Sequence, residues 1–321
     1  MSAISLAPRS LPPIFSPMVT QTSQPTTQPL TPRLDGDVRT YPWHWQGQPI
    51  RVAYEILGTG DPVLLLPAFS TVSTRAELKQ LANQLKAQFQ VTALDWPGFG
   101  DSDRGPLNYQ PALYRQFLTN FVESELATPT AVLAAGHAAG YVVQVASQHP
   151  GFWSKIGLIA PTWRGPLVVM GAPQAVRDGV RELVRSPLLG QVLYGLNTRP
   201  DFLKWMYRRH VFVDDTKLTE DYIQQRYQGT QQSGARYAPA AFVTGSLDPA
   251  PTREALLANF ENLSVPLMAI VADQAPPGSK AEMEAIATLP NVQQARYSGT
   301  LGMAEEFGTE LAPMLLSFLQ E

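Results

Sequence analysis

The stretch AVLAAGHAAG at residues 131–140 decides the fold of this chain. Residues 131–135 are small or apolar and predict a buried strand, and the segment from Ala138 to His149 predicts a helix. Gly136 and Gly140 bracket a sharp turn between the two, because glycine lets a turn lie close to the next strand and helix. We place Ala138 at the centre of this turn, so a methyl group that cannot attack a carbonyl occupies the position of a nucleophile.

Upstream of the turn, the sequence predicts a strand, a loop, a helix and another strand. The apolar run 63–66 ends at Pro67-Ala68-Phe69-Ser70, an amphipathic helix is predicted over about residues 75–89, and the run DWPGFGDSD follows at 95–103. Together with the turn, this order resembles the α/β-hydrolase superfamily, whose nucleophile motif is Gly-x-Ser-x-Gly. The opening Trp43-His44-Trp45 is also similar to the chloroplast and cyanobacterial branch that includes pheophytinase and chlorophyll dephytylase. The resemblance covers most of the chain after its N-terminal tail.

The resemblance implies an α/β-hydrolase fold, with a mostly parallel central sheet flanked by helices and a helical cap. Apolar runs without alternation suit parallel strands buried on both faces. The pattern from 161 to 265 is helical and contains no strand, so we expect it to pack on the carboxyl edge of the sheet as the cap. The core then comprises residues 37–160 and 266–321. The expected strands are 38–45, 51–57, 62–66, 90–95, 130–135, 155–160, 267–272 and 292–298.

The resemblance also implies positions for a catalytic triad, and all three lack the expected residue. The nucleophile position holds Ala138. The acid would follow the penultimate strand, where Ala275 stands, and Asp273 is expected to point elsewhere. The histidine would follow the last strand, where Leu301 or Gly302 stands. Losing all three groups disfavours ester hydrolysis by the route of the superfamily.

The residues around the turn are candidates for binding instead. Backbone amides depend little on side-chain identity, so those of Phe69 and Ala139 could still form an oxyanion site, or could cap a helix or bind water. Ser70 is the fallback nucleophile, although no histidine partner for it is visible. A capped pocket for a hydrophobic ligand is expected, covered by cap residues such as Phe202 and Trp205. The ligand-binding candidates are Phe69, Ser70, His137, Ala138, Ala139 and Trp163.

The histidines and the missing cysteines argue against a metal. The chain has four histidines, no two of them at metal-ligand spacing, and no cysteine. We expect His137 to make a buried structural hydrogen bond. No cofactor is predicted. The cap is rich in arginine, and a cluster there could dock an acidic partner or an anionic membrane surface. These arginines are Arg177, Arg181, Arg185, Arg199, Arg208, Arg209 and Arg226.

Composition limits the partners further. The 321 residues are 44% hydrophobic with a net charge of −3 and no long basic run, which gives no footprint for nucleic acid. No apolar stretch reaches the about 18 residues of a membrane span, so membrane contact is expected to be peripheral at most. Residues 1–36 are rich in Pro, Ser, Thr and Gln and predict a disordered or targeting tail. Two locations are compatible with this tail: the cytoplasm of a cyanobacterium, or a plastid if the tail is a transit peptide. In either location we expect a soluble protein, which could associate with thylakoid membranes.

We therefore carry three hypotheses of function. The first is a pseudoenzyme that binds a hydrophobic ligand or acts as an assembly or regulatory factor, in the context of photosynthetic membranes. The second is a carboxylic-ester hydrolase with a rearranged serine site, and the third is a structural interaction protein with a collapsed pocket. Enzymatic activity is disfavoured but left open.

Overall fold

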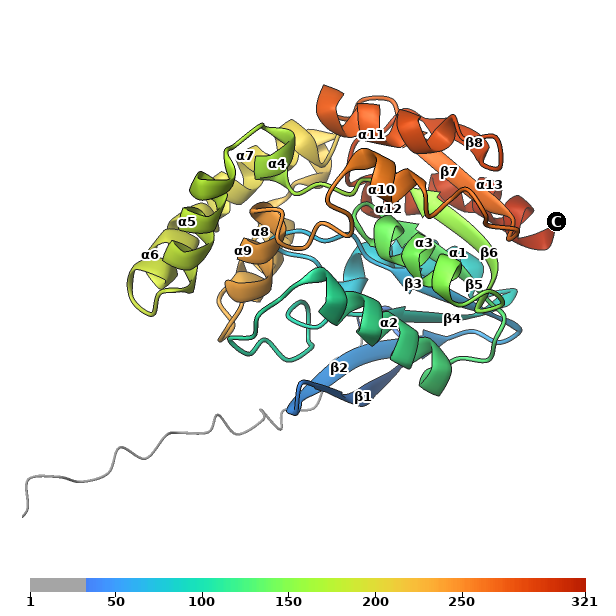
Figure 1. The fold of residues 1–321 in the computed structure, drawn as a ribbon, viewed down its shortest axis with the longest axis horizontal. Coiled ribbons are helices and arrows are strands. Elements are labelled where there is room, and N and C mark those ends of the chain that lie inside the picture. The colour runs from blue at the N-terminus through green and yellow to red at the C-terminus, as the bar shows by residue number, and fades with distance from the viewer. Residues whose placement is uncertain (1–32) are drawn as a thin grey trace, which may run out of the picture.

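The computed structural model describes residues 33–321, which form one sheet of eight strands with helices packed around it (Figure 1). The strands are β1 (Asp37–Trp45), β2 (Gln48–Leu57), β3 (Asp61–Leu66), β4 (Phe89–Leu94), β5 (Thr130–Ala135), β6 (Trp153–Ile159), β7 (Leu267–Ala272) and β8 (Gln293–Tyr297). Their spatial order is β1-β2-β4-β3-β5-β6-β7-β8. The pairs β1–β2 and β2–β4 are antiparallel, and every other pair is parallel. The predicted α/β class and mostly parallel sheet are confirmed.

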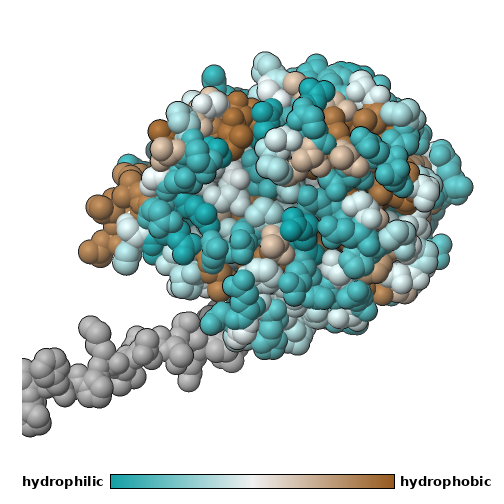
Figure 2. Space-filling model, in the orientation of Figure 1, coloured by the Kyte–Doolittle hydropathy of each residue, from teal (hydrophilic) through white to brown (hydrophobic). Residues whose placement is uncertain are grey.

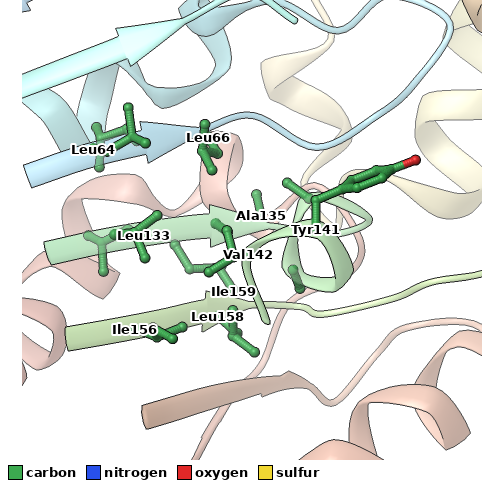
Figure 3. Packing of buried hydrophobic residues seen from close by; sticks show 14 of the residues in the cluster. Leu64, Leu66, Leu133, Ala135, Tyr141, Val142, Ile156, Leu158 and Ile159 are labelled. Atoms are coloured by element: carbon green, nitrogen blue, oxygen red, sulfur yellow. The ribbon is translucent and has the colours of Figure 1, made fainter. Parts of the chain in front are cut away.

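The centre of the sheet is buried on both faces, as its unbroken apolar runs predict. Strands β3, β5 and β6 lie side by side, and Leu64, Leu133 and Ile156 lie on these three strands in the core (Figure 3). All six residues of β5 and of β7 are buried, which explains why both strands have the bounds expected from the sequence.

Helices connect the strands and cover the sheet. Those around the sheet are η1 (Arg75–Leu78), α1 (Lys79–Leu85), α2 (Pro111–Glu125), α3 (Ala138–Gln148), α10 (Arg253–Leu257), α11 (Pro277–Ala287), α12 (Met303–Glu306) and α13 (Gly308–Gln320). Helix α1 packs against α13, and α2 packs against α3.

A separate group of helices stands beside the sheet (Figure 1). It comprises α4 (Pro166–Val169), α5 (Gln174–Arg185), α6 (Leu189–Asn197), α7 (Pro200–His210), η2 (Asp215–Lys217), α8 (Glu220–Thr230) and α9 (Tyr237–Val243). They lie within the stretch 161–265 for which the sequence predicts a cap, and we call them the cap helices. The sequence pattern favours separate helices over 176–189 and 192–196. The first ends four residues earlier, at Arg185, because Ser186 precedes a proline and takes an extended conformation.

The described chain begins earlier than the predicted core. Leu34 is fully buried, and the Glu55 carboxylate accepts hydrogen bonds from the amides of Leu34 at 2.9 Å and Gly36 at 2.7 Å. The Arg33 guanidinium pairs with Asp101 at 2.9 Å. Residues 33–36 are thus packed on the core, and the predicted tail of 36 residues is four residues too long at this end. Its remaining residues, 1–32, lie outside the described part of the chain.

The DWPGFGDSD run is held by a buried ion network. The Arg75 guanidinium contacts Glu55 at 3.1 Å, Asp101 at 3.0 Å and also Asp95. Asp95 follows β4, and its carboxylate accepts hydrogen bonds from the amides of Arg75 at 2.6 Å and Asp101 at 2.7 Å. Gly100 has φ +53°, and a Cβ there would lie 2.1 Å from the Asp95 carboxyl carbon. The loop can therefore close over Asp95 only with a glycine at this position.

Candidate functional site

The sharp turn after β5 is centred on Gly136 and not on Ala138. Gly136 directly follows the strand and has φ +51°, whereas Ala138 is already the first residue of α3 and is fully buried. In α/β-hydrolase turns the nucleophile occupies the strained position between strand and helix. The sequence-based assignment is therefore two residues too late, because the two glycines of 136–140 suggested a motif that the backbone does not follow. Gly136, which takes this strained conformation, has no side chain.

The turn keeps close contact with the loop after β3. A Cβ added to Gly136 would lie 2.9 Å from the Ala68 Cβ. The predicted amide pair is only half correct, since the Ala139 amide donates to the Gly136 carbonyl at 3.2 Å and is thereby used within the turn. With the corrected centre, the amide that follows it belongs to His137. Within residues 33–321, the amides of Phe69 and His137 donate to no acceptor, which leaves these two donors for an oxyanion-type site.

Most of the candidate ligand-binding residues are buried by the protein itself. Phe69 is 3% exposed, and its ring contacts Trp96, His137 and Tyr141 at centroid distances of 5.0, 5.8 and 5.6 Å. His137, Ala138, Ala139 and Trp163 are each at most 2% exposed, and only Ser70 is partly exposed. Side chains of the protein therefore fill the space around the turn. Defined hollows of about 160 and 480 Å³ lie elsewhere, one beside the end of α3 and one beside the C-terminus.

The segment Leu247–Pro249, which follows the cap helices, covers α3. The Leu247 carbonyl accepts hydrogen bonds from His137 Nε2 at 3.1 Å and from the Tyr141 hydroxyl at 2.5 Å. A Cβ added to Gly140 would lie 2.3 Å from Pro249 Cγ, so this glycine is needed for the close approach of the segment. The expected buried hydrogen bond of His137 is present. Burial lowers the pKa of His137 to about 4, so the ring is neutral near pH 7.

Asp248 is a buried carboxyl that sequence reasoning missed. Its Oδ1 lies 3.6 Å from His137 Nε2 and accepts a hydrogen bond from the Gly165 amide at 2.8 Å. The pKa of Asp248 is raised to about 7, mainly by burial and also by the nearby Glu282, although the Gly165 amide, Arg177 and Arg164 each lower it. No motif marks this residue, because only the fold brings it beside His137.

The acid position contains no carboxylate that faces the turn. Ala275, the residue that the sequence places at the acid position, is 7% exposed. Asp273 points elsewhere, since its Oδ1 lies 2.6 Å from Arg296 Nη2 and 3.7 Å from Lys280 Nζ. The buried Glu282 carboxylate accepts from the Trp163 amide at 3.0 Å and pairs with Arg164, so it fixes the loop after β6.

Val211, which follows α7, covers Gly302, one of the two candidates for the histidine position. The Gly302 amide donates to the Val211 carbonyl at 3.1 Å, and a Cβ on Gly302 would lie 2.4 Å from Val211 Cγ1. The Thr300 hydroxyl also donates to the Val211 carbonyl. Leu301, the other candidate for this position, is partly exposed and packs against the core. An imidazole at 302 would therefore collide with the residue that follows α7.

An ion cluster ties α8 to the same region. Arg226 is buried, pairs with Glu305, and lies 3.8 Å from the Glu77 carboxylate. The Tyr222 hydroxyl donates to Glu305 at 2.8 Å. Burial and the neighbouring Glu305 raise the pKa of Glu77, which opposes its ionisation. Arg226 is thus a structural residue that joins the cap helices to the sheet, and not a surface charge as the arginine-rich pattern suggested.

Within residues 33–321, Ser70, the fallback nucleophile, makes no hydrogen bond to a histidine or a carboxylate. Ser70 Oγ accepts a hydrogen bond from the Val72 amide at 3.2 Å, whereas His137 is bonded to Leu247. Among residues 33–321, no cluster of three or more histidine, aspartate or glutamate side chains could hold a metal ion. Phe202 and Trp205, expected to cover a pocket, are 39% and 53% exposed and face solvent.

The sheet order, the turn after β5 and the helices between β6 and β7 define an α/β-hydrolase fold. A model of the alpha/beta hydrolase family matches residues 63–303, so the chain belongs to this family. No curated protein matches the sequence. In the part that the structure describes, no helix has the length and apolar character needed to cross a membrane.

Several solved structures share the fold. The Cfl2 protein of Burkholderia cenocepacia is 21% identical, with a TM-score of 0.69 over 90% of this chain and 97% of its own. A bromoperoxidase from Bacillus anthracis is 18% identical, with a TM-score of 0.68 over 89% of this chain and 100% of its own. A meta-cleavage product hydrolase from Pseudomonas fluorescens is 15% identical, with a TM-score of 0.64 over 84% of this chain and 94% of its own. At sequence identities this low, the similarity to these structures shows a shared fold and nothing about activity.

Proposed function

We propose that this chain is a non-hydrolytic member of its family that acts as an assembly or regulatory protein through its surface. The observation that carries the proposal is that Gly136 has φ +51° and that Val211 covers Gly302. We take these two glycines as the nucleophile and histidine positions of the family. A side chain at either position would have to displace protein atoms. Catalysis by the family's route needs a nucleophile, a base and an orienting acid together, and these positions supply none of them.

A carboxylic-ester hydrolase that uses Ser70 is the competing enzyme hypothesis. The test is intact-mass analysis after exposure to a fluorophosphonate probe for active serines, with Ser70→Ala as the control. We expect no adduct, because an unactivated hydroxyl is a weak nucleophile. A stoichiometric adduct that the control loses would overturn the proposal and make Ser70 a nucleophile.

A hydrophobic ligand, such as the lipid, phytyl or chlorophyll-type ligand that the resemblance suggests for photosynthetic membranes, is the second form of a non-hydrolytic role. It would have to displace Phe69 or the segment Leu247–Pro249, because the residues around the turn are packed. A binding screen against a lipid extract tests it. Retention above background would favour a ligand carrier, and none would leave the collapsed-pocket protein, whose function lies in its surface.

A further inference from the structure

We propose that the outer face of α6 docks on a membrane surface that contains anionic lipids. The proposal goes beyond the loss of hydrolysis and does not depend on it. It starts from four large apolar side chains, which we call the α6 face. They are Leu188, Leu189, Val192 and Leu196, which are 82%, 63%, 62% and 53% exposed.

The α6 face is one side of an amphipathic helix whose other side is already packed. Gly190 and Tyr194 are buried, and a Cβ on Gly190 would lie 2.0 Å from the Val184 carbonyl oxygen. Leu188, Val192 and Leu196 are spaced by four residues and so share one side. Hydrophobic side chains gather at the end of the cap helices in Figure 2, where α6 lies in Figure 1. A soluble monomer rarely leaves a helix side of this kind uncovered.

The charges of the segment that contains α6 and α7 favour an anionic partner. Residues 183–210 contain five basic residues and one acidic residue, although the whole chain has a net charge of −3. Arg199 directly precedes α7, and Lys204 and Arg209 lie on it. Within residues 33–321, these three side chains form no ion pair with a carboxylate. They remain available for lipid phosphates.

Aromatic residues on α7 complete the composition typical of an interfacial helix. Phe202 and Trp205 are exposed and contact each other at a ring distance of 5.6 Å, and the Arg209 guanidinium lies 6.0 Å from the Trp205 ring. The consecutive helices α6 and α7 together expose leucine and valine suited to the acyl boundary, tryptophan suited to the interface and arginine suited to the headgroups, which is the composition of segments that lie in a membrane surface. A hydrophobic groove on a partner protein could also cover the α6 face, but it would not explain the excess of basic residues in 183–210.

The test is flotation of the full chain with phosphatidylcholine vesicles that contain phosphatidylglycerol, compared with pure phosphatidylcholine. We expect binding to the anionic vesicles that weakens as salt rises. Val192→Glu should reduce the partition coefficient at least about tenfold, because it places a charge on the exposed apolar face that would enter the membrane. Arg199→Glu and Arg209→Glu should each reduce it by about fivefold or more.

Two control variants separate this surface from general effects. Gln191→Glu adds the same charge one residue away, where the side chain faces Arg236 at 2.8 Å, and should bind as the wild type does. Arg253→Glu reverses an exposed charge on α10 and should also leave binding unchanged. Unchanged urea unfolding of Val192→Glu shows that the fold is intact.

Failure of the wild-type chain to float with anionic vesicles overturns the proposal, as does equal binding by Val192→Glu. If the chain is instead a dimer in sedimentation and Val192→Glu makes it monomeric without any vesicle binding, the face covers a second copy and the membrane proposal is wrong. None of these outcomes changes the fluorophosphonate result, so the two proposals fail independently.

Discussion

Replacing Asp248 with asparagine tests the account of the turn and the segment that covers it. The wild-type carboxyl is mostly buried, lies 3.6 Å from a neutral His137 and accepts one hydrogen bond from the Gly165 amide. Burial raises the pKa of Asp248 from 3.8 to about 7. Asparagine keeps an acceptor oxygen for Gly165 and removes the charge, so the variant changes the electrostatics and little of the packing.

The direction of the effect follows from the protons bound. As the pH rises from about 4 to about 7, Asp248 loses its proton in the unfolded chain but keeps it in the folded chain. The free energy of unfolding of the wild type therefore falls through this range. A pKa gap of this size corresponds to about 4 kcal/mol. Because the side chain retains some contact with water, we expect about 2–4 kcal/mol. Asp248→Asn should match the wild type near pH 4 and exceed its free energy of unfolding by that amount above pH 7.

Urea unfolding followed by circular dichroism between pH 4 and pH 8 measures the difference directly. Asp221→Asn, an exposed aspartate on α8, is the matched control, and its difference from the wild type should stay flat across this range. A difference for Asp248→Asn that does not change with pH would refute the reasoning, because it would mean that the carboxyl is ionised at little cost in the folded state.

Three further substitutions test the packing around the empty triad positions by urea unfolding. Gly136→Ala should lower the free energy of unfolding by about 1–3 kcal/mol, because alanine is strained at φ +51° and its Cβ would lie 2.9 Å from the Ala68 Cβ. Gly302→Ala should cost about 1–3 kcal/mol, because its Cβ would meet Val211. Arg226→Met should cost about 3–5 kcal/mol at neutral pH, since it leaves two buried carboxylates without their cation.

The glycine substitutions have a control within the chain. Gly47 has φ +78° and no atom within 4 Å of an added Cβ, so Gly47→Ala measures backbone strain alone. If Gly136→Ala unfolds at the same urea concentration as the wild type, the left-handed conformation of Gly136 is contradicted. If Gly302→Ala is as stable as the wild type, Val211 does not pack against residue 302. For Arg226→Met, a loss that grows as pH falls would contradict the reasoning, because protonation of the partner carboxylates should reduce the cost.

The parts of the fold that sequence predicts best are those where one local pattern has one solution. Strands β5 and β7 are runs of six buried residues, and their bounds follow from hydrophobicity alone. The split between α5 and α6 was also readable, because Pro187 restricts Ser186. The centre of the turn after β5 could not be predicted from the sequence. Small residues stand at 134, 136, 138 and 140, so the Gly-x-Ser-x-Gly motif can be aligned in two ways. The left-handed φ of Gly136 decides between them.

The rest of the site depends on contacts between segments far apart in the sequence. Val211 lies about 90 residues from Gly302, and Leu247 lies 110 residues from His137. Leu34 sits in a segment whose composition predicts a tail, yet the Glu55 carboxylate fixes its amide. No periodicity or motif encodes such pairings, because each arises only when the sheet order is complete.

Under the proposed function, a single serine at 136 or a single histidine at 302 should not produce hydrolysis, because protein atoms already fill the space beside both glycines. A serine at 136 must push against Ala68, and a histidine at 302 must displace Val211. Moving Val211 would also break the hydrogen bonds that its carbonyl accepts from the Gly302 amide and the Thr300 hydroxyl. Either substitution alone would therefore cost stability without supplying the other groups that a triad needs.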